Sequence, residues 1–132
     1  MTKSRLRSGK AMDYESVSIV HSEVAAGVTY SVAKMSFARR TELMRQVREL
    51  ARRVEFFEAG QDPGQKMDAS ILQAEIDRLY LGWGLRSIAG LQLDGAPATP
   101  ELLAESGPED LCREALAAVR RETGLTESER KN

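Results

Sequence analysis

Hydrophobic and polar residues alternate in two short stretches near the start of the chain. Residues 16–24 read "SVSIVHSEV" and residues 27–35 read "GVTYSVAKM". Alternation with a period of two predicts β-strands, and the "AAG" between them places Gly27 in or near the turn of a β-hairpin. A lone hairpin is only marginally stable in water, so this one must pack on the rest of the chain or pair with another chain.

At Ser36 the hydrophobic period changes to that of a helix. Ser36 is a suitable N-cap for a helix through "FARRTELMRQVRELARRVEFFEAG", and Gly60 with "QDPG" ends it. A second helix is expected from about Gln65 to Gly82, and the short turn between the two predicts an antiparallel pair. The expected apolar stripes are Phe37, Met44, Val47, Leu50, Ala51, Val54 and Phe57 on the first helix, and Ile71 or Leu72, Ile76, Leu79, Tyr80 and Trp83 on the second.

Glycines interrupt the helical pattern in the connector "GWGLRSIAGLQLDGAPATP", where "LQLDG" has the alternation of a short strand. Thr99, Pro100 and Glu101 then provide an N-cap, a proline at the first helical position and an acid in the first turn, which predicts a short helix to about Glu105. A last helix is expected to begin near Gly107-Pro108-Glu109-Asp110 and to end near Thr123. Its expected buried face comprises Leu111, Ala115, Leu116 and Val119, and Gly124 is its expected C-terminal cap.

The pattern as a whole predicts an α+β fold that is mostly α. Its expected order is an N-terminal β-hairpin, an antiparallel helix pair, a Gly-rich connector and two further helices. With 132 residues, 42% of them hydrophobic, the chain suits one globular domain, expected over residues 13–124. Residues 1–12 are expected to form a basic flexible arm and residues 125–132 a frayed C-terminal tail.

Charge and targeting signals narrow the possible partners and the compartment. The formal net charge of −1 gives the whole protein no electrostatic attraction to DNA or to an anionic membrane. The sequence has no apolar run long enough to span a membrane, and its first residues lack the apolar core of a signal peptide. The only cysteine, Cys112, cannot form an intramolecular disulfide. A cytoplasmic location is therefore expected.

No motif in the sequence predicts catalysis, and we expect neither an enzyme nor a bound cofactor or metal. One His and one Cys do not make a zinc site of the usual kind. Cys112, next to Leu111 on the last helix, is expected to be a small half-buried side chain. The "SGK" at residues 8–10 lacks the upstream glycine and preceding strand of a phosphate-binding loop.

The candidate functional residues are those expected to bind a partner protein. Arginines are dense on the first helix, and an acidic partner protein suits that face better than DNA does, because Glu42 and Glu49 are interleaved with them. Trp83 is either a core anchor that closes the helix pair or an anchor in a partner's pocket. The full candidate set is Trp83, Arg39, Arg45, Arg48, Arg52, Leu91 and Leu93.

Several segments after Ser36 carry a resemblance to a known family. The segments are "MSFARRTEL", "IDRLYLGWGLRSIAGLQLDGAPATPELL" and "GPEDLCREALAAVRRETGLTESERKN". Together they resemble the tail assembly chaperones of long-tailed phages and prophages. The family shows a tryptophan-bearing helix, a connector of the form "GL.LDG.PAT", a "GPE.L" helix start and a terminal "GL[ST]E.ERKN".

The resemblance implies a non-enzymatic role in the host cytoplasm. Members of the family bind the tape-measure protein, a long helical polypeptide, and help to recruit tail-tube subunits. They are commonly missing from the mature virion. Many also exist as a longer form made by a ribosomal frameshift. Such a frameshift would explain why Thr126 and Glu129, which have the spacing of a helix-starting capping box, stand so close to Asn132.

Three other functional interpretations stay open at the level of sequence. The same surfaces could pack permanently in a structural tail or connector subunit of the virion. A small DNA-binding regulator could use the basic arm and the arginine face, although nucleic-acid binding is the less expected use. The hairpin's unpaired edge could also add a strand from a second copy, giving a homo-oligomer.

Overall fold

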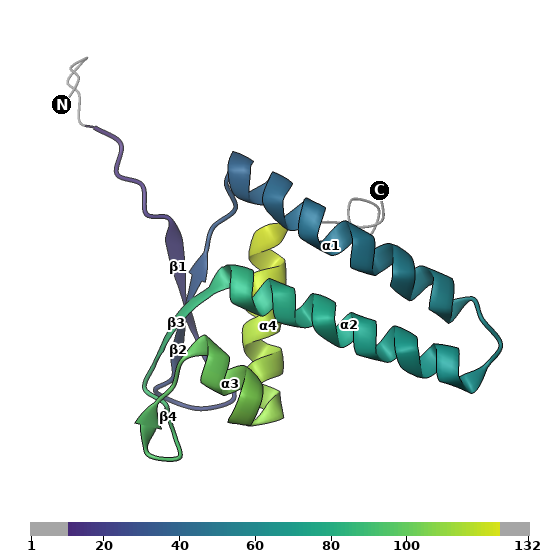
Figure 1. Ribbon diagram of the computed structural model, residues 1–132. Coiled ribbons are helices and arrows are strands. Elements are labelled where there is room, and N and C mark those ends of the chain that lie inside the picture. The colour runs from purple at the N-terminus through teal and green to yellow at the C-terminus, as the bar shows by residue number, and fades with distance from the viewer. Residues whose placement is uncertain (1–10, 125–132) are drawn as a thin grey trace.

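The computed structural model describes residues 11–124. Nearly all of the predicted basic arm (1–12), the predicted tail (125–132) and the capping box at Thr126 and Glu129 lie outside the described residues. The described chain is α+β and mostly helical, as predicted (Figure 1). Its elements are β1 (Val17–His21), β2 (Thr29–Ala33), α1 (Phe37–Glu58), α2 (Pro63–Gly84), β3 (Leu85–Ala89), β4 (Gln92–Leu93), β5 (Ala96–Pro97), α3 (Pro100–Ser106) and α4 (Glu109–Thr123).

The predicted hairpin is present, but it is part of a larger sheet. β1 and β2 pair antiparallel, and the loop between them contains Gly27 at a φ of +86°, a conformation that favours glycine. β2 also pairs with β3, which gives a three-stranded sheet in the order β1-β2-β3. Residues 85–89, part of the predicted Gly-rich connector (residues 82–100), thus form a third strand that the sequence pattern did not predict. The short β4–β5 hairpin that follows includes the predicted "LQLDG" strand.

A β-bulge explains why the alternation of β3 was missed. Ser31 pairs with Ser87 but Val32 pairs with Leu85, so Arg86 is an extra residue opposite β2. The bulge places Leu85 and Ile88 three positions apart on the same side, and a search with a period of two does not detect that spacing.

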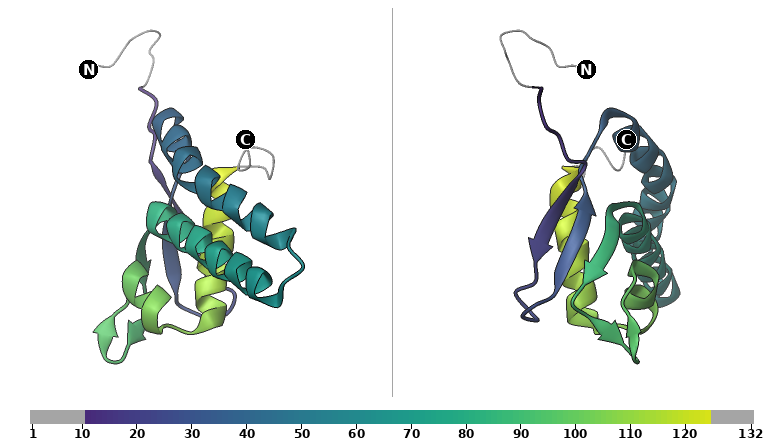
Figure 2. Two further views of the ribbon diagram at one scale, coloured as in Figure 1. Left: turned by 45° about the vertical axis from the view of Figure 1, so that its right-hand side comes forward. Right: turned by 90° about the vertical axis from the view of Figure 1, so that its left-hand side faces the viewer.

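One face of the sheet packs against α4 and α2, and α1 lies alongside α2 (Figure 2). The residues of β2 that point to this side, Tyr30 and Val32, are fully buried. Gly84, at the end of α2, lies so close to α4 that an added Cβ would come within 2.5 Å of Cγ1 of Val119. The core therefore lies between the sheet and the three long helices.

The apolar stripes of the long helices agree with the prediction except at their edges. Leu43, Val47, Ala51 and Val54 are the buried residues of α1. Phe37, predicted in the stripe, is 93% exposed because it is the first residue of the helix and has no neighbouring element to pack on. Of the predicted alternatives Ile71 and Leu72 on α2, Leu72 is the buried one, while Ile71 is 55% exposed.

The predicted caps are confirmed, and they account for where the helices begin and end. The Ser36 hydroxyl accepts from the Arg39 amide at 3.3 Å, and the Thr99 hydroxyl accepts from the Leu102 amide at 3.1 Å. Gly124 ends α4 in the left-handed conformation at a φ of +62°. The second helix is longer than predicted, because Pro63 takes the first helical position and the helix continues through Trp83 to Gly84.

Candidate functional site

A groove follows the exposed side of α2 where α3, α4 and the end of α1 flank it. It consists of three adjoining hollows of about 260, 180 and 680 Å³. The first two share Arg78 and Leu81, and the last two share Ala74 and Asp77, so each hollow adjoins the next along α2. We call this feature the α2 groove. Its lining residues are Glu58, Lys66, Ala69, Ser70, Gln73, Ala74, Asp77, Arg78, Leu81, Gly82, Pro100, Glu101, Ala104, Glu105, Glu109, Cys112, Arg113 and Leu116.

Short side chains at helical spacing make the groove possible. Ala74 stands four positions after Ser70 and Gly82 eight positions after Ala74, so the three follow a slowly turning line along the exposed side of α2. Ala104 of α3 faces the same space. Because these side chains are small, a depression is left between the flanking helices. Leu81 and Leu116 form the apolar part of its floor.

Several of the charged groups on the rims of the groove have partners within the protein. Arg113 binds Glu109 at 2.7 Å, and Arg78 forms an ion pair with Glu105 that joins α2 to α3. The Lys66 ammonium donates to the main-chain carbonyl of Glu58 at 2.7 Å. A ligand that covers the Arg78–Glu105 and Arg113–Glu109 pairs therefore leaves none of these four charges without a partner.

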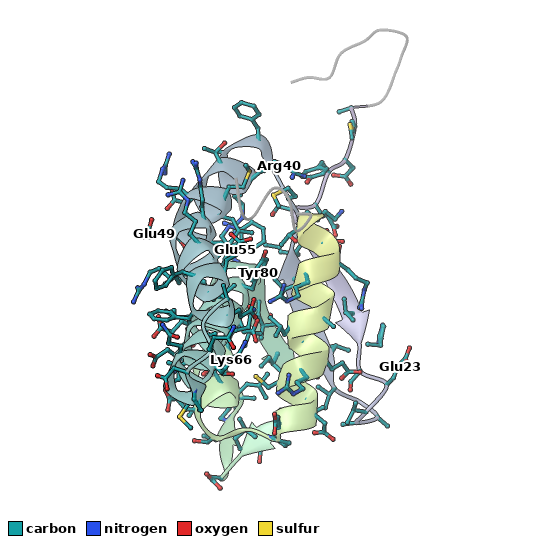
Figure 3. The ribbon with its side chains drawn as sticks, turned by 90° about the vertical axis from the view of Figure 1, so that its right-hand side faces the viewer. Glu23, Arg40, Glu49, Glu55, Lys66 and Tyr80 are labelled. Atoms are coloured by element: carbon teal, nitrogen blue, oxygen red, sulfur yellow. The ribbon has the colours of Figure 1, made fainter. Side chains whose placement is uncertain are left out.

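A polar contact between α2 and α4 lies beside the groove and includes Asp77 of its lining. Arg120 binds Asp77 at 2.5 Å, and its guanidinium carbon lies 4.4 Å from the centre of the Tyr80 ring. Figure 3 shows Tyr80 between the helix pair and α4. These contacts hold the two helices in a defined position, so the groove is formed before any ligand arrives.

The thiol of Cys112 lines the middle hollow without the properties of a reactive cysteine. Burial raises the pKa of Cys112, and the nearby carboxylates of Asp77 and Glu109 act in the same direction. The side chain is half-buried, as predicted. The group therefore stays a protonated thiol at neutral pH and contributes apolar surface to the floor.

Two of the predicted partner-binding residues, Arg39 and Trp83, contact each other. The Arg39 guanidinium carbon lies 4.3 Å from the centre of the indole ring, and its Nη2 donates to the main-chain carbonyl of Trp83 in the last turn of α2. Burial, assisted by the nearby charge of Arg86, lowers the pKa of Arg39. Because a cation at a helix C-terminus stabilises the unpaired carbonyls there, this pair joins the start of α1 to the end of α2. Of the two interpretations of Trp83, this contact supports the anchor that closes the helix pair.

The other candidate arginines lie on the exposed surface of α1. Arg45 binds Glu42 at 2.6 Å, and Arg52 lies 3.9 Å from Glu49. Arg48 is exposed on the same helix. The interleaved acids thus take up part of the positive charge, and none of these arginines lines the α2 groove.

Leu91 and Leu93, the last two candidates, lie beside the β4–β5 hairpin. Leu91 packs half-buried against the core, and Leu93 is half-buried in β4. The structure therefore does not bring the candidate set together at one place. The groove was missed because its residues are small or belong to different helices. The spacings of four and eight residues between Ser70, Ala74 and Gly82 are the signal that could have indicated it.

Residues 11–124 contain neither a metal-binding cluster nor a membrane-spanning helix. This part of the chain holds no group of three or more His, Cys, Asp or Glu side chains placed to bind a metal ion. None of its helices combines the length and the apolar character that crossing a membrane requires. No known protein family, no curated protein and no solved structure is found to match the chain.

Proposed function

We propose that this chain is a tail assembly chaperone of a long-tailed phage or prophage, acting by protein–protein contacts and without catalysis. In this proposal the α2 groove holds an amphipathic helix of the tape-measure protein and so assists assembly of the tail tube. The observation that carries it is the groove itself, with an apolar floor at Leu81 and Leu116 and the Arg78–Glu105 and Arg113–Glu109 ion pairs on its rims. The resemblance in sequence supplies the identity of the partners.

The dimensions of the groove support a helical ligand. It follows α2 from Lys66 to Gly82, which corresponds to about 25 Å along a helix, or between four and five turns of a ligand helix. A ligand of that length would bring apolar side chains at i, i+3, i+4 and i+7 to the floor. A long helical polypeptide offers many such segments, and burying them would keep it soluble before the tube assembles.

The ion pairs on the rim support a reversible contact. Rim charges that are already paired add little affinity, so most of the binding free energy would come from the modest apolar floor. A chaperone has to release its ligand, and moderate affinity suits that requirement. The proposed place of action is the host cytoplasm, and the protein is expected to be missing from the mature virion.

A structural tail or connector subunit is the main alternative, in which the same groove is filled permanently. The DNA-binding alternative is less well supported, because Arg45 and Arg52 of the arginine face are paired with neighbouring acids. Mass spectrometry of purified particles separates the first two functions. A chaperone should be missing from them, whereas a structural subunit should be present in a fixed number of copies.

The direct test is co-expression with the tape-measure protein encoded near this chain, followed by recovery of the soluble complex. Ala74 is exposed and lines two of the three hollows, so Ala74→Trp should fill the groove without disturbing the core. Ala117, an exposed alanine of α4 that lines none of the three hollows, gives the matched control Ala117→Trp. We expect Ala74→Trp to lose the complex and Ala117→Trp to keep it. A tape-measure protein that stays insoluble with the unaltered chain would contradict the proposal.

A further inference from the structure

The strand β1 is at the edge of the sheet, and one side of its backbone is open. The main-chain carbonyl of Ser16 accepts from the Lys34 amide at 2.8 Å, and the Ser22 amide donates to the Val28 carbonyl at 2.9 Å. The even-numbered residues therefore bond to β2, and the amides and carbonyls of Val17, Ile19 and His21 point away from it. Within residues 11–124 no strand pairs with that side.

The edge at β1 lacks the features that usually prevent strand addition. Its sequence, VSIVH, contains no charged residue and no proline, its register with β2 is regular, and Ile19 is 59% exposed. The opposite edge differs, because β3 has a bulge at the exposed Arg86. Bulges and charged side chains are the means by which natural edges avoid pairing, so the contrast singles out β1.

We propose that β1 pairs antiparallel with β1 of a second copy of this chain, on a two-fold axis through Ile19. In this register Val17 lies opposite His21 of the second copy, and the two Ile19 residues lie opposite each other. All of the outward-pointing amides and carbonyls of β1 are then used, in about six hydrogen bonds. The two sheets become one continuous sheet of six strands.

The side chains around β1 fit this register. Val17, Ile19 and His21 point to the sheet face opposite the buried Tyr30 and Val32. Their partners on β2 are Ala33, Ser31 and Thr29. That face is uncharged along both strands, so two copies meet without repulsion between their strands. Isologous contact requires such a self-complementary surface.

The flanks of β1 give the dimer a signature. The chain bends after His21, where the Val24 and Ala25 amides bond to the Ser22 hydroxyl, so the paired register is confined to β1 itself. Glu15 and Glu23 stand just outside the two ends of β1, so antiparallel pairing brings Glu15 of one copy toward Glu23 of the other, and these like charges repel. Because salt screens exposed charges, the dimer should become tighter as ionic strength rises.

Sedimentation velocity of the full chain over a range of concentrations tests the dimer. A single pair of five-residue strands is a small interface, so we expect a dissociation constant in the micromolar range. Ile19→Lys places two ammonium groups together on the axis and should weaken the dimer by roughly tenfold or more. The control is Ile71→Lys, because Ile71 on α2 is exposed to nearly the same degree (55% against 59%) and should have no effect.

Cysteine cross-linking tests the register, in a chain where Cys112 is replaced by alanine. Directly opposed residues of a hydrogen-bonded pair have Cα atoms about 5.5 Å apart, within the range of a disulfide. Ile19→Cys should therefore cross-link to itself, whereas Ser18→Cys should not, because its counterpart is Val20 of the second copy. A chain that stays monomeric at millimolar concentration, a dimer that survives Ile19→Lys, or equal cross-linking at both positions would overturn the proposal.

The α2 groove and the β1 edge are tested separately. Ile19→Lys leaves the lining of the groove unaltered, so recovery of the tape-measure protein should persist in that variant. If Ile19→Lys loses the tape-measure protein and the unaltered chain is monomeric, the edge accepts a strand of that partner, and the dimer proposal is wrong.

Discussion

The Tyr30 hydroxyl of β2 donates a hydrogen bond of 2.9 Å to the Glu114 carboxylate of α4. The same carboxylate accepts from the Ser22 hydroxyl at 2.6 Å and from the Glu23 amide at 2.7 Å. In Figure 3, Glu23 lies on the side of α4 away from the α1–α2 pair, in the loop that joins β1 to β2. A single side chain of α4 thus holds both the hairpin loop and the middle strand of the sheet.

Replacing Glu114 should destabilise the fold. In Glu114→Gln the amide group cannot accept all three hydrogen bonds, and one donor is left without an acceptor. We expect a loss of about 1–3 kcal/mol in the free energy of unfolding, measured by urea denaturation. Glu109→Gln on the same helix removes only an exposed ion pair with Arg113 and should cost about 0.5 kcal/mol or less. Equal losses in the two variants would contradict the role given to Glu114.

The same contacts predict how stability changes in acid. Burial by itself would raise the pKa of Glu114, but the hydrogen bonds from Ser22, from the Glu23 amide and from Tyr30 outweigh it and lower that pKa. A lowered pKa in the folded state adds stability at pH values above the ordinary glutamate pKa, and this stability is lost as pH falls through the folded pKa. The urea midpoint should therefore fall less steeply below about pH 4.3 in Glu114→Gln than in the unaltered chain. If the urea midpoints of the two proteins fell in parallel as the pH is lowered, the prediction would be wrong.

Tyr30 predicts the opposite dependence in alkali. The pKa of Tyr30 is raised to about 12, mainly by burial and secondly by the hydrogen bond to Glu114. The unfolded chain loses this proton near the ordinary tyrosine pKa of about 10, so the stabilising contribution declines as pH rises from about 10 to 12. Tyr30→Phe should remove that decline, as followed by circular dichroism at increasing pH. Tyr14→Phe, at an exposed tyrosine, is the control and should leave the alkaline profile unchanged.

The contact between Arg39 and Trp83 predicts which arginine of α1 contributes to stability. Arg39→Ala removes a guanidinium that stacks on the indole ring and bonds to the end of α2, and we expect a loss of about 1–2 kcal/mol. Arg45→Ala removes an exposed pair with Glu42 and should change stability by about 0.5 kcal/mol or less. Thermal unfolding followed by tryptophan fluorescence measures both variants. The interpretation of Trp83 as a closing anchor would be wrong if Arg39→Ala were neutral.

Two glycines at the end of α2 should respond to alanine in opposite directions. An added Cβ at Gly84 would lie 2.5 Å from Val119, so Gly84→Ala should overpack the core and cost about 1–3 kcal/mol. At Gly82 nothing lies within 4 Å of an added Cβ, and alanine should stabilise the helix there by about 0.5–1 kcal/mol. Chemical denaturation of the two variants checks the signs. Destabilisation of similar size at both positions would show that the contact with Val119 is not the cause.

The local signals in the sequence determined most of the helices and the hairpin. Ser36, Thr99 and Gly124 act within one turn of themselves, through hydrogen bonds and backbone conformations that depend on near neighbours, so they could be read from the chain alone. The turn at Gly27 and the burial of Tyr30 and Val32 on one side of β2 follow in the same way from a period of two.

Only the tertiary structure decided how these elements meet. The bulge at Arg86 exists because β3 must match β2, and the stacking of Arg39 on Trp83 exists because α1 returns beside α2. The α2 groove depends on side chains from four helices. The edge at β1 is open because β3 pairs with β2 and not with β1. Such features arise from contacts between residues far apart in the chain, and a pattern with a period of two or 3.6 residues contains no information about which distant residues will meet.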